Sequence, residues 1–150
     1  FTLDEGLSNA VEEVFNKYIS EETVNGQKVF VAKEGDNTIG YAFPIGGTAL
    51  WGTVEGFAAV SEDFSELLGI DFVSHSETPG LGGRISEDWF KEQFRGLMLT
   101  NSNNGNYIVY KPAPGGNVDA IAGATLTSKS VSDFINKDIY EFIKENRGGI

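Results

Sequence analysis

The residues best suited to chemistry form one stretch, residues 118–130, which reads VDAIAGATLTSKS. Hydroxyl groups on Thr125, Thr127 and Ser128 stand ahead of a helical pattern, and residues 122–124 have almost no side chain. A helix start leaves about four backbone N–H groups without intrahelical partners, at the positive end of the helix dipole. Such a place can bind a phosphate. An ordinary turn with a Ser or Thr N-cap has the same pattern, so both interpretations stay open.

A glycine-rich loop over residues 75–83, HSETPGLGG, is the second candidate. Its proline fixes one φ angle, and its glycines allow positive φ or close approach of a ligand. The loop follows a predicted strand and could cradle a flat ring. A plain strand-to-helix loop would have the same composition, and His75 or Glu77 alone would more often be a satisfied or solvated side chain.

Residues 119–125, DAIAGAT, resemble the flavinylation motif of the FMN-binding domain family. The family includes one subunit of the sodium-pumping NADH:quinone oxidoreductase and one of the Rnf electron-transport complex. Its motif reads Asp, two variable residues, Ser or Thr, Gly, Ala and Thr. Asp119, Gly123, Ala124 and Thr125 match it in register, whereas Ala122 stands where the family usually has Ser or Thr.

Two further segments resemble the same family. Residues 75–82 match its His-x-Glu-Thr-Pro-Gly-Leu-Gly segment at every defined position. Residues 47–52, GTALWG, are similar to a Gly-x-Gly-Leu-Trp-Gly segment of the NADH:quinone oxidoreductase branch, with a departure at Ala49. The three segments follow the family's order, and the flavin-site core that they define spans about residues 40–135. The resemblance leaves the branch open.

The resemblance implies an FMN cofactor that is bound covalently, through a phosphoester at Thr125. It implies that Thr78 donates a hydrogen bond to the flavin and that Leu81 presses on its ring. No catalytic residue and no metal ligand is expected. The implied cofactor-binding residues come from the three segments: Leu50, Trp51, His75, Glu77, Thr78, Pro79, Gly80, Leu81, Gly82, Asp119, Gly123, Ala124, Thr125, Leu126 and Thr127.

The resemblance also implies partners and a location. We expect an electron-carrying relay with FMN, associated with other subunits of a membrane redox complex that couples electron flow to Na+ or H+ movement. A separate flavin transferase, with FAD as donor, would install the cofactor. The domain would be a soluble part on the extracytoplasmic side of the cell membrane, attached only by an N-terminal anchor that precedes Phe1.

Composition excludes several other classes of protein. The chain has 150 residues, no cysteine and one histidine, which rules out disulfides, thiolate chemistry, cysteine-ligated zinc and multi-histidine metal sites. Its net charge of −11 disfavours nucleic acid as a partner. A hydrolase would have to pair His75 with Ser74 or Ser76, and neighbouring residues of a strand point to opposite faces.

Hydrophobic periodicity predicts one α+β domain over residues 1–150, with a mostly antiparallel twisted sheet of about five to seven strands flanked by helices. Trp89, Phe90 and Phe94 are expected in the core, and Ser86 as an N-cap. The flavin would lie between residues 78–83 and the Thr125 turn. The predicted helices are 6–18, 87–94 and 128–146, and the predicted strands are 27–33, 38–43, 51–60, 68–74, 107–111 and 118–121, with a hairpin turn at 34–37 and a break at 44–47.

A second hypothesis stands beside the covalent carrier. A non-enzymatic module could bind FMN or another phosphate ligand without a covalent bond, for sensing or scaffolding. Ala122 is the sequence feature that favours it.

Overall fold

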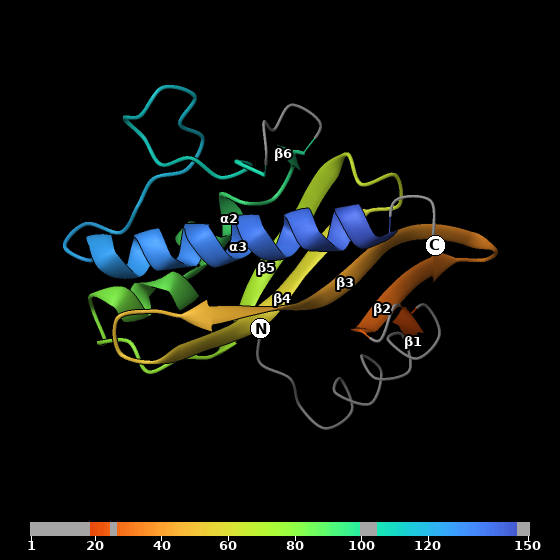
Figure 1. The fold of residues 1–150 in the computed structure, drawn as a ribbon, viewed down its shortest axis with the longest axis horizontal. Coiled ribbons are helices and arrows are strands. Elements are labelled where there is room, and N and C mark those ends of the chain that lie inside the picture. The colour runs from red at the N-terminus through yellow and green to blue at the C-terminus, as the bar shows by residue number, and fades with distance from the viewer. Residues whose placement is uncertain (1–18, 25–26, 100–104, 147–150) are drawn as a thin grey trace.

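The computed structural model describes residues 19–24, 27–99 and 105–146, and the predicted helix 6–18 lies outside them. Its centre is a six-stranded antiparallel sheet in chain order, which confirms the predicted α+β fold (Figure 1). The strands are β1 (Ile19–Val24), β2 (Gln27–Glu34), β3 (Asn37–Thr48), β4 (Thr53–Ser61), β5 (Glu66–Ser74) and β6 (Leu97–Met98). The described helices are η1 (Gly82–Ser86), α2 (Asp88–Glu92) and α3 (Thr125–Asn146).

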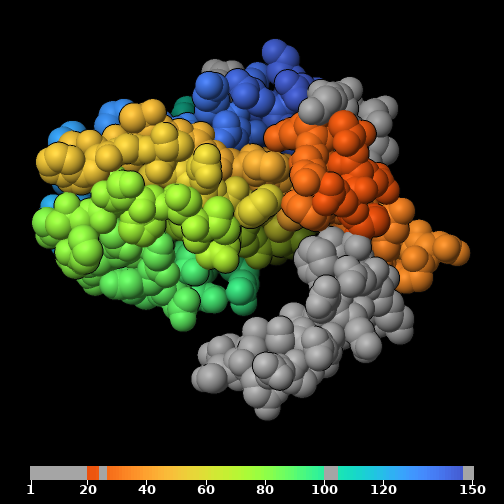
Figure 2. Space-filling view, turned by 90° about the horizontal axis from the view of Figure 1, so that it is seen from below, coloured from red at the N-terminus to blue at the C-terminus, as the bar shows by residue number. Residues whose placement is uncertain are grey.

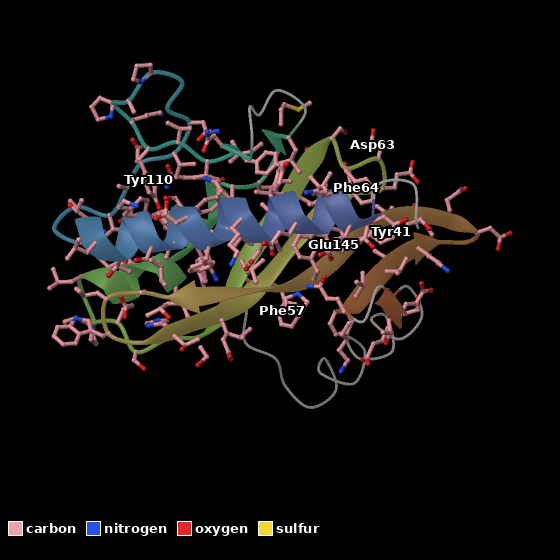
Figure 3. The ribbon with its side chains drawn as sticks, in the orientation of Figure 1. Tyr41, Phe57, Asp63, Phe64, Tyr110 and Glu145 are labelled. Atoms are coloured by element: carbon pink, nitrogen blue, oxygen red, sulfur yellow. The ribbon has the colours of Figure 1, made fainter. Side chains whose placement is uncertain are left out.

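Helix α3 covers one face of the sheet along its length, and Figure 2 shows it above the strands. Its apolar stripe has the predicted spacing and is buried: Val131, Phe134, Ile135, Ile139, Phe142 and Ile143. The ring of Phe142 stacks on that of Phe43 from β3, with centroids 3.9 Å apart. Near the same end of the helix, Tyr41 and Phe64 contact Phe142 as well (Figure 3).

A polar contact also joins α3 to β3. The Gly46 N–H donates to Oδ2 of Asp138 at 2.9 Å, across 92 residues of sequence. Partial burial raises the pKa of the Asp138 carboxyl above its ordinary value, against the opposing effect of that hydrogen bond.

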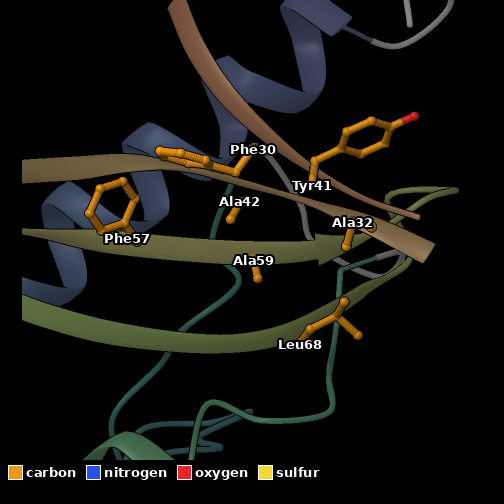
Figure 4. A pocket seen from close by; sticks show the side chains of 8 residues that line it. Phe30, Ala32, Tyr41, Ala42, Phe57, Ala59 and Leu68 are labelled. Carbon is orange, nitrogen blue, oxygen red and sulfur yellow. The ribbon is translucent and has the colours of Figure 1, made fainter. Parts of the chain in front are cut away.

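The opposite face of the sheet carries a shallow apolar groove of about 380 Å³ (Figure 4). It exists because residues alternate between the two faces of a strand, so that the neighbours of the buried Val31 and Phe43 point away from α3. Its lining side chains include Phe30, Ala32, Ala42, Phe57, Ala59 and Leu68.

Strand β3 is longer than predicted. The expected break at residues 44–47 is wrong, because β3 continues to Thr48 and pairs Pro44 with Phe57 of β4. Pairing with β2 ends at Ala42, opposite Phe30. Beyond that point β3 pairs with β4, and among the described residues no strand pairs with its other edge, so a proline that lacks an N–H is tolerated there.

The segment before α3 is not a pair of strands. In place of the predicted strands 107–111 and 118–121, the structure has one isolated parallel bridge, between Tyr110 and Val118. A few backbone hydrogen bonds join the two segments, such as that from the Lys111 N–H to the Val118 carbonyl, and side-chain amides add others. Asn117 accepts from the Val109 N–H and donates to the Tyr107 carbonyl, and Asn136 of α3 contacts both the N–H and the carbonyl of Ile108.

The region between β5 and β6 also differs from the prediction. The predicted helix 87–94 is shortened to α2, Asp88–Glu92, and its N-cap is Glu87 rather than Ser86. Residues 82–86, just before it, form the separate short helix η1, which was not predicted. Phe90 and Phe94 are fully buried as expected, but Trp89 is 40% exposed. Its indole N–H donates to Glu87, and the Arg84 guanidinium lies over its ring at 5.3 Å, which explains its place at the surface.

Candidate functional site

The buried carboxylate of Glu77 joins three segments that are distant in sequence. Glu77 is 4% exposed. Its Oε1 accepts the Leu50 N–H at 3.1 Å and the Thr127 hydroxyl at 2.8 Å, and its Oε2 accepts the Trp51 N–H at 2.9 Å. The β3–β4 turn, the 75–83 loop and the first turn of α3 therefore meet at one side chain.

His75 fixes the backbone of that loop. Its Nδ1 accepts the Glu77 N–H at 3.1 Å, and its Nε2 lies 3.1 Å from Oγ of Ser86. Because Nδ1 accepts, the neutral ring carries its proton on Nε2 and donates it to Ser86. A general base would need a free lone pair on Nε2, so this geometry argues against a serine hydrolase built on His75.

Thr125 is the first residue of α3, three residues earlier than the predicted helix start, and it is exposed. The preceding turn has Gly123 at φ +77° and a hydrogen bond from the Ala124 N–H to the Ile121 carbonyl. The Ser128 N–H donates to the Ala124 carbonyl at 2.9 Å. The N–H groups of residues 125–127 precede the Ser128 N–H in the chain, so they lie at the start of the helix, which is its positive end.

Ser128 anchors this turn to the body of the domain. Its hydroxyl accepts the Ile121 N–H at 3.1 Å, and its carbonyl accepts the Tyr110 hydroxyl at 2.7 Å. Tyr110 lies beside the N-terminal half of α3 (Figure 3). Burial raises the pKa of the Tyr110 hydroxyl, which keeps it protonated and able to donate.

The 75–83 loop packs directly against the Thr125 turn. The N–H groups of Leu81 and Gly83 both donate to the Thr78 carbonyl, which closes the loop on itself. A Cβ placed on Gly123 would lie 3.6 Å from Cδ2 of Leu81, and a Cβ on Gly82 would lie 2.6 Å from Oγ1 of Thr127. The two candidate segments are thus neighbours in space.

Four large apolar side chains are exposed on the segments that meet at Glu77. Leu50 is 49% exposed, Trp51 65%, Leu81 47% and Leu126 62%. We call these four residues the apolar rim. The β3–β4 turn, η1 and the start of α3 lie at the same end of the molecule (Figure 1). Exposed apolar groups gathered in one place indicate a surface that binds a ligand or a partner.

The FMN-binding domain family's sequence profile matches residues 49–139, more than half of the chain. The chain belongs to this family. The resemblance seen in residues 75–82 and 119–125 is therefore confirmed at the level of the family.

Relatives come from both branches of the family. One is a subunit of the Na(+)-translocating NADH-quinone reductase of Vibrio anguillarum, 37% identical over 108 residues, which are 69% of this chain and 42% of that protein. Another is a subunit of the proton-translocating ferredoxin:NAD(+) oxidoreductase complex of Clostridium ljungdahlii, 34% identical over 127 residues, 84% of this chain and 65% of that protein. The chain thus spans less than two thirds of either relative.

A solved structure has the same fold. It is the crystal structure of the corresponding subunit of the Na(+)-translocating NADH-quinone reductase from Parabacteroides distasonis, which is 27% identical. The TM-score is 0.73, over 96% of this chain and 84% of that one. The single α+β domain built on an antiparallel sheet is therefore a fold that this family shares.

Within this FMN-binding domain the predicted site residues divide into two groups. The exposed group includes Thr125 itself: Leu50, Trp51, Thr78, Pro79, Gly80, Leu81, Asp119, Gly123, Thr125 and Leu126. Glu77, Gly82, Ala124 and Thr127 are buried beneath it, and His75 is half-buried. The structure brings both groups to one end of the domain.

Some residues that build this site were not predicted. Gln93 binds the backbone of Asp119 twice: its Oε1 accepts the Asp119 N–H at 2.7 Å, and its Nε2 donates to the Asp119 carbonyl at 3.1 Å. Ser86 and Tyr110 were not predicted as supports either. All three act on partners that are remote in sequence, so local patterns carry no signal for them.

None of the helices in the described ranges has the length and apolarity of a membrane span.

Proposed function

We propose that this chain is an electron-transfer domain that carries FMN through a phosphoester on Thr125. The observation that carries the proposal is the exposed residue Thr125 on the first turn of α3, next to Leu126 of the apolar rim. When bound, FMN would supply reversible electron uptake and release. The protein would hold the cofactor in place, shield one side of it and control the approach of partners.

The residues present fit both ends of such a cofactor. The N–H groups of residues 125–127 and the helix dipole favour a phosphate at Thr125, and Gly123 adds no side chain to the turn before it. The rim residues Leu50, Trp51, Leu81 and Leu126 would contact an aromatic ring system, since mainly apolar surfaces with a few placed polar groups are typical of cofactor sites.

Attachment would be a phosphoryl transfer. A bond forms between Oγ of Thr125 and the FMN phosphorus of FAD, the pyrophosphate P–O bond breaks, AMP leaves and the hydroxyl proton is released. A separate flavin transferase would catalyse this step. The exposure of Thr125 supports the proposal, because the transferase must reach its hydroxyl.

The domain would act as a relay subunit of a membrane ion-pumping redox complex. Both relatives named above are subunits of ion-translocating oxidoreductases, which supports this assignment. A ring on the exposed rim would be open to a neighbouring subunit. We place the domain on the extracytoplasmic side with an N-terminal anchor, where a covalent bond prevents loss of a cofactor that the cell could not recover.

Co-expression with an active flavin transferase tests the proposal. The intact mass should increase by one FMN phosphoester, and peptide mapping should place it on the peptide that contains Thr125. Thr125→Ala should remove the adduct. The exposed Thr48 provides a matched control, because Thr48→Ala should leave it unchanged. Absence of an adduct on the parent chain, while the transferase modifies another target, would refute the covalent proposal.

A non-covalent FMN module is the second candidate, and Ala122 favours it. Ala122 lies in the exposed turn before α3, at the one position where the motif departs from the family pattern. Tight flavin binding by Thr125→Ala would establish this alternative.

A further inference from the structure

Glu77 is a buried acid whose partners among the described residues are hydrogen-bond donors of the domain itself. Two of them are successive backbone N–H groups, those of Leu50 and Trp51, and the third is the Thr127 hydroxyl. Both carboxylate oxygens are used, and the contacts of 2.8 to 3.1 Å have the lengths of good hydrogen bonds. The side chain is buried beneath the segments that carry the rim.

Each donor belongs to a segment that carries part of the proposed flavin site. The N–H groups are those of two rim residues, whose side chains are about half or more exposed. Thr127 is two residues beyond the proposed attachment point, Thr125, on the same helical turn. The position of the turn 50–51 relative to the start of α3 therefore depends on one carboxylate.

We infer that Glu77 is a positioning residue that holds the Leu50–Trp51 turn against the first turn of α3 and so orders the flavin ring on the rim. The inference rests on the proposed function. Glu77 acts through Leu50, Trp51 and Thr127 and does not need to touch the cofactor. We name this hydrogen-bonded arrangement of Glu77 with Leu50, Trp51 and Thr127 the carboxylate clasp.

The clasp requires a carboxylate of this length. Three donors converge on two oxygens, and an amide offers one oxygen and an NH2 group that would face a donor. Aspartate is one methylene shorter and would not reach both turns. The surroundings support this arrangement, because His75 fixes the Glu77 N–H and the missing side chain of Gly82 leaves room for the Thr127 hydroxyl.

Two variant pairs isolate the clasp. Glu77→Gln removes one acceptor, and Glu55→Gln neutralises an exposed acid of β4 as its control. Thr127→Val replaces the hydroxyl by a methyl group of similar shape, whereas Thr127→Ser restores the hydroxyl. Ile139→Val, in the buried stripe of α3, serves as a control for a moderate loss of stability away from the site.

Hydrogen exchange on the flavin-free domain is the first measurement. At least one of the two amides, those of Leu50 and Trp51, should exchange about tenfold faster in Glu77→Gln, because glutamine keeps only one of the two acceptor oxygens. Exchange at these amides should be unchanged in Glu55→Gln. This measurement needs no cofactor, so it reports on the clasp even if the proposed function fails.

Fluorescence anisotropy and iodide quenching of the attached flavin are the second measurement. Glu77→Gln and Thr127→Val should still carry FMN on Thr125, with lower anisotropy and stronger quenching than the parent. Thr127→Ser, Glu55→Gln and Ile139→Val should match the parent.

Unchanged anisotropy and quenching in Glu77→Gln would overturn the inference while leaving the covalent carrier intact. If Glu77→Gln does not fold, the Thr127→Val and Thr127→Ser pair decides by the same readouts. A parent chain that accepts no flavin would instead overturn the proposed function, and the two failures are therefore distinct.

Discussion

Gly82→Ala should destabilise the domain by way of the Thr127 hydroxyl. A Cβ at position 82 would lie 2.6 Å from Oγ1 of Thr127 and 3.1 Å from its Cγ2. The Cβ of Glu77 would be 3.1 Å away. Gly82 is not among the described glycines with positive φ, so alanine fits its backbone conformation and the cost arises from these contacts.

The magnitude follows from what must move. Thr127 can rotate its hydroxyl away from position 82, but it then loses the 2.8 Å bond to Glu77. A hydrogen bond to a charged group contributes about 1.5–3 kcal/mol. Replacing glycine by alanine stabilises the fold by about 0.5–1 kcal/mol, because it lowers the conformational entropy of the unfolded chain. The net loss is then about 0.5–2.5 kcal/mol, which lowers the midpoint of thermal unfolding by roughly 1–10 °C.

A double-mutant cycle with Thr127→Ala tests this reasoning. Thr127→Ala removes both Oγ1 and Cγ2, so Gly82→Ala should cost at least about 1 kcal/mol less in that background than in the parent. Urea unfolding followed by circular dichroism gives the four free energies. Gly80→Ala is the control, since Gly80 has φ +76° and no atom within 4 Å of an added Cβ. Gly80→Ala should lower the free energy of unfolding through backbone strain, by the same amount with Thr127 and with Ala at position 127. Equal costs of Gly82→Ala in both backgrounds would refute the argument.

Two further predictions concern the packing of α3. Phe142→Ala should lower the free energy of unfolding by about 3–5 kcal/mol, because Phe142 is fully buried against Phe43; denaturant unfolding measures this, and a loss under about 1 kcal/mol would contradict the packing. Asp138→Asn should flatten the pH dependence of stability. A raised carboxyl pKa favours the protonated folded state, so its stabilising effect is complete below the unfolded pKa and is lost as pH rises through the folded pKa. Thermal unfolding should be measured from acidic to neutral pH. The unfolding temperature of the variant should rise relative to that of the parent as pH increases, and a difference that stays constant with pH would exclude this effect.

The elements with a strong local period could be predicted from sequence. The stripe from Val131 to Ile143 identified α3 because each apolar residue meets the sheet at helical spacing. The hairpin at residues 34–37 was also confirmed, since β2 ends at Glu34 and pairs it with Asn37. In both cases the signal and its structural cause are contained in the same few residues.

The failures have long-range causes. Pro44 lies inside β3 because β2 no longer pairs there, and the local sequence does not contain the end of that pairing. Segments 107–111 and 118–121 have strand-forming residues, but within the described chain they make only one isolated bridge and join no sheet. For Glu77, sequence indicated a functional segment but not the buried environment, because its donors are 26 to 50 residues away.

The order of the strands has a consequence for how the molecule is made. Each strand pairs with the next strand along the chain, so most of the sheet can form while synthesis continues. Helix α3 depends on contacts such as that between Gly46 and Asp138, 92 residues apart, and it follows all six described strands along the chain. Thr125 therefore reaches its final place only when this closing step occurs. A modifying enzyme that requires the finished turn must act after α3 has docked on the sheet, whereas one that accepts an open turn can act before α3 docks.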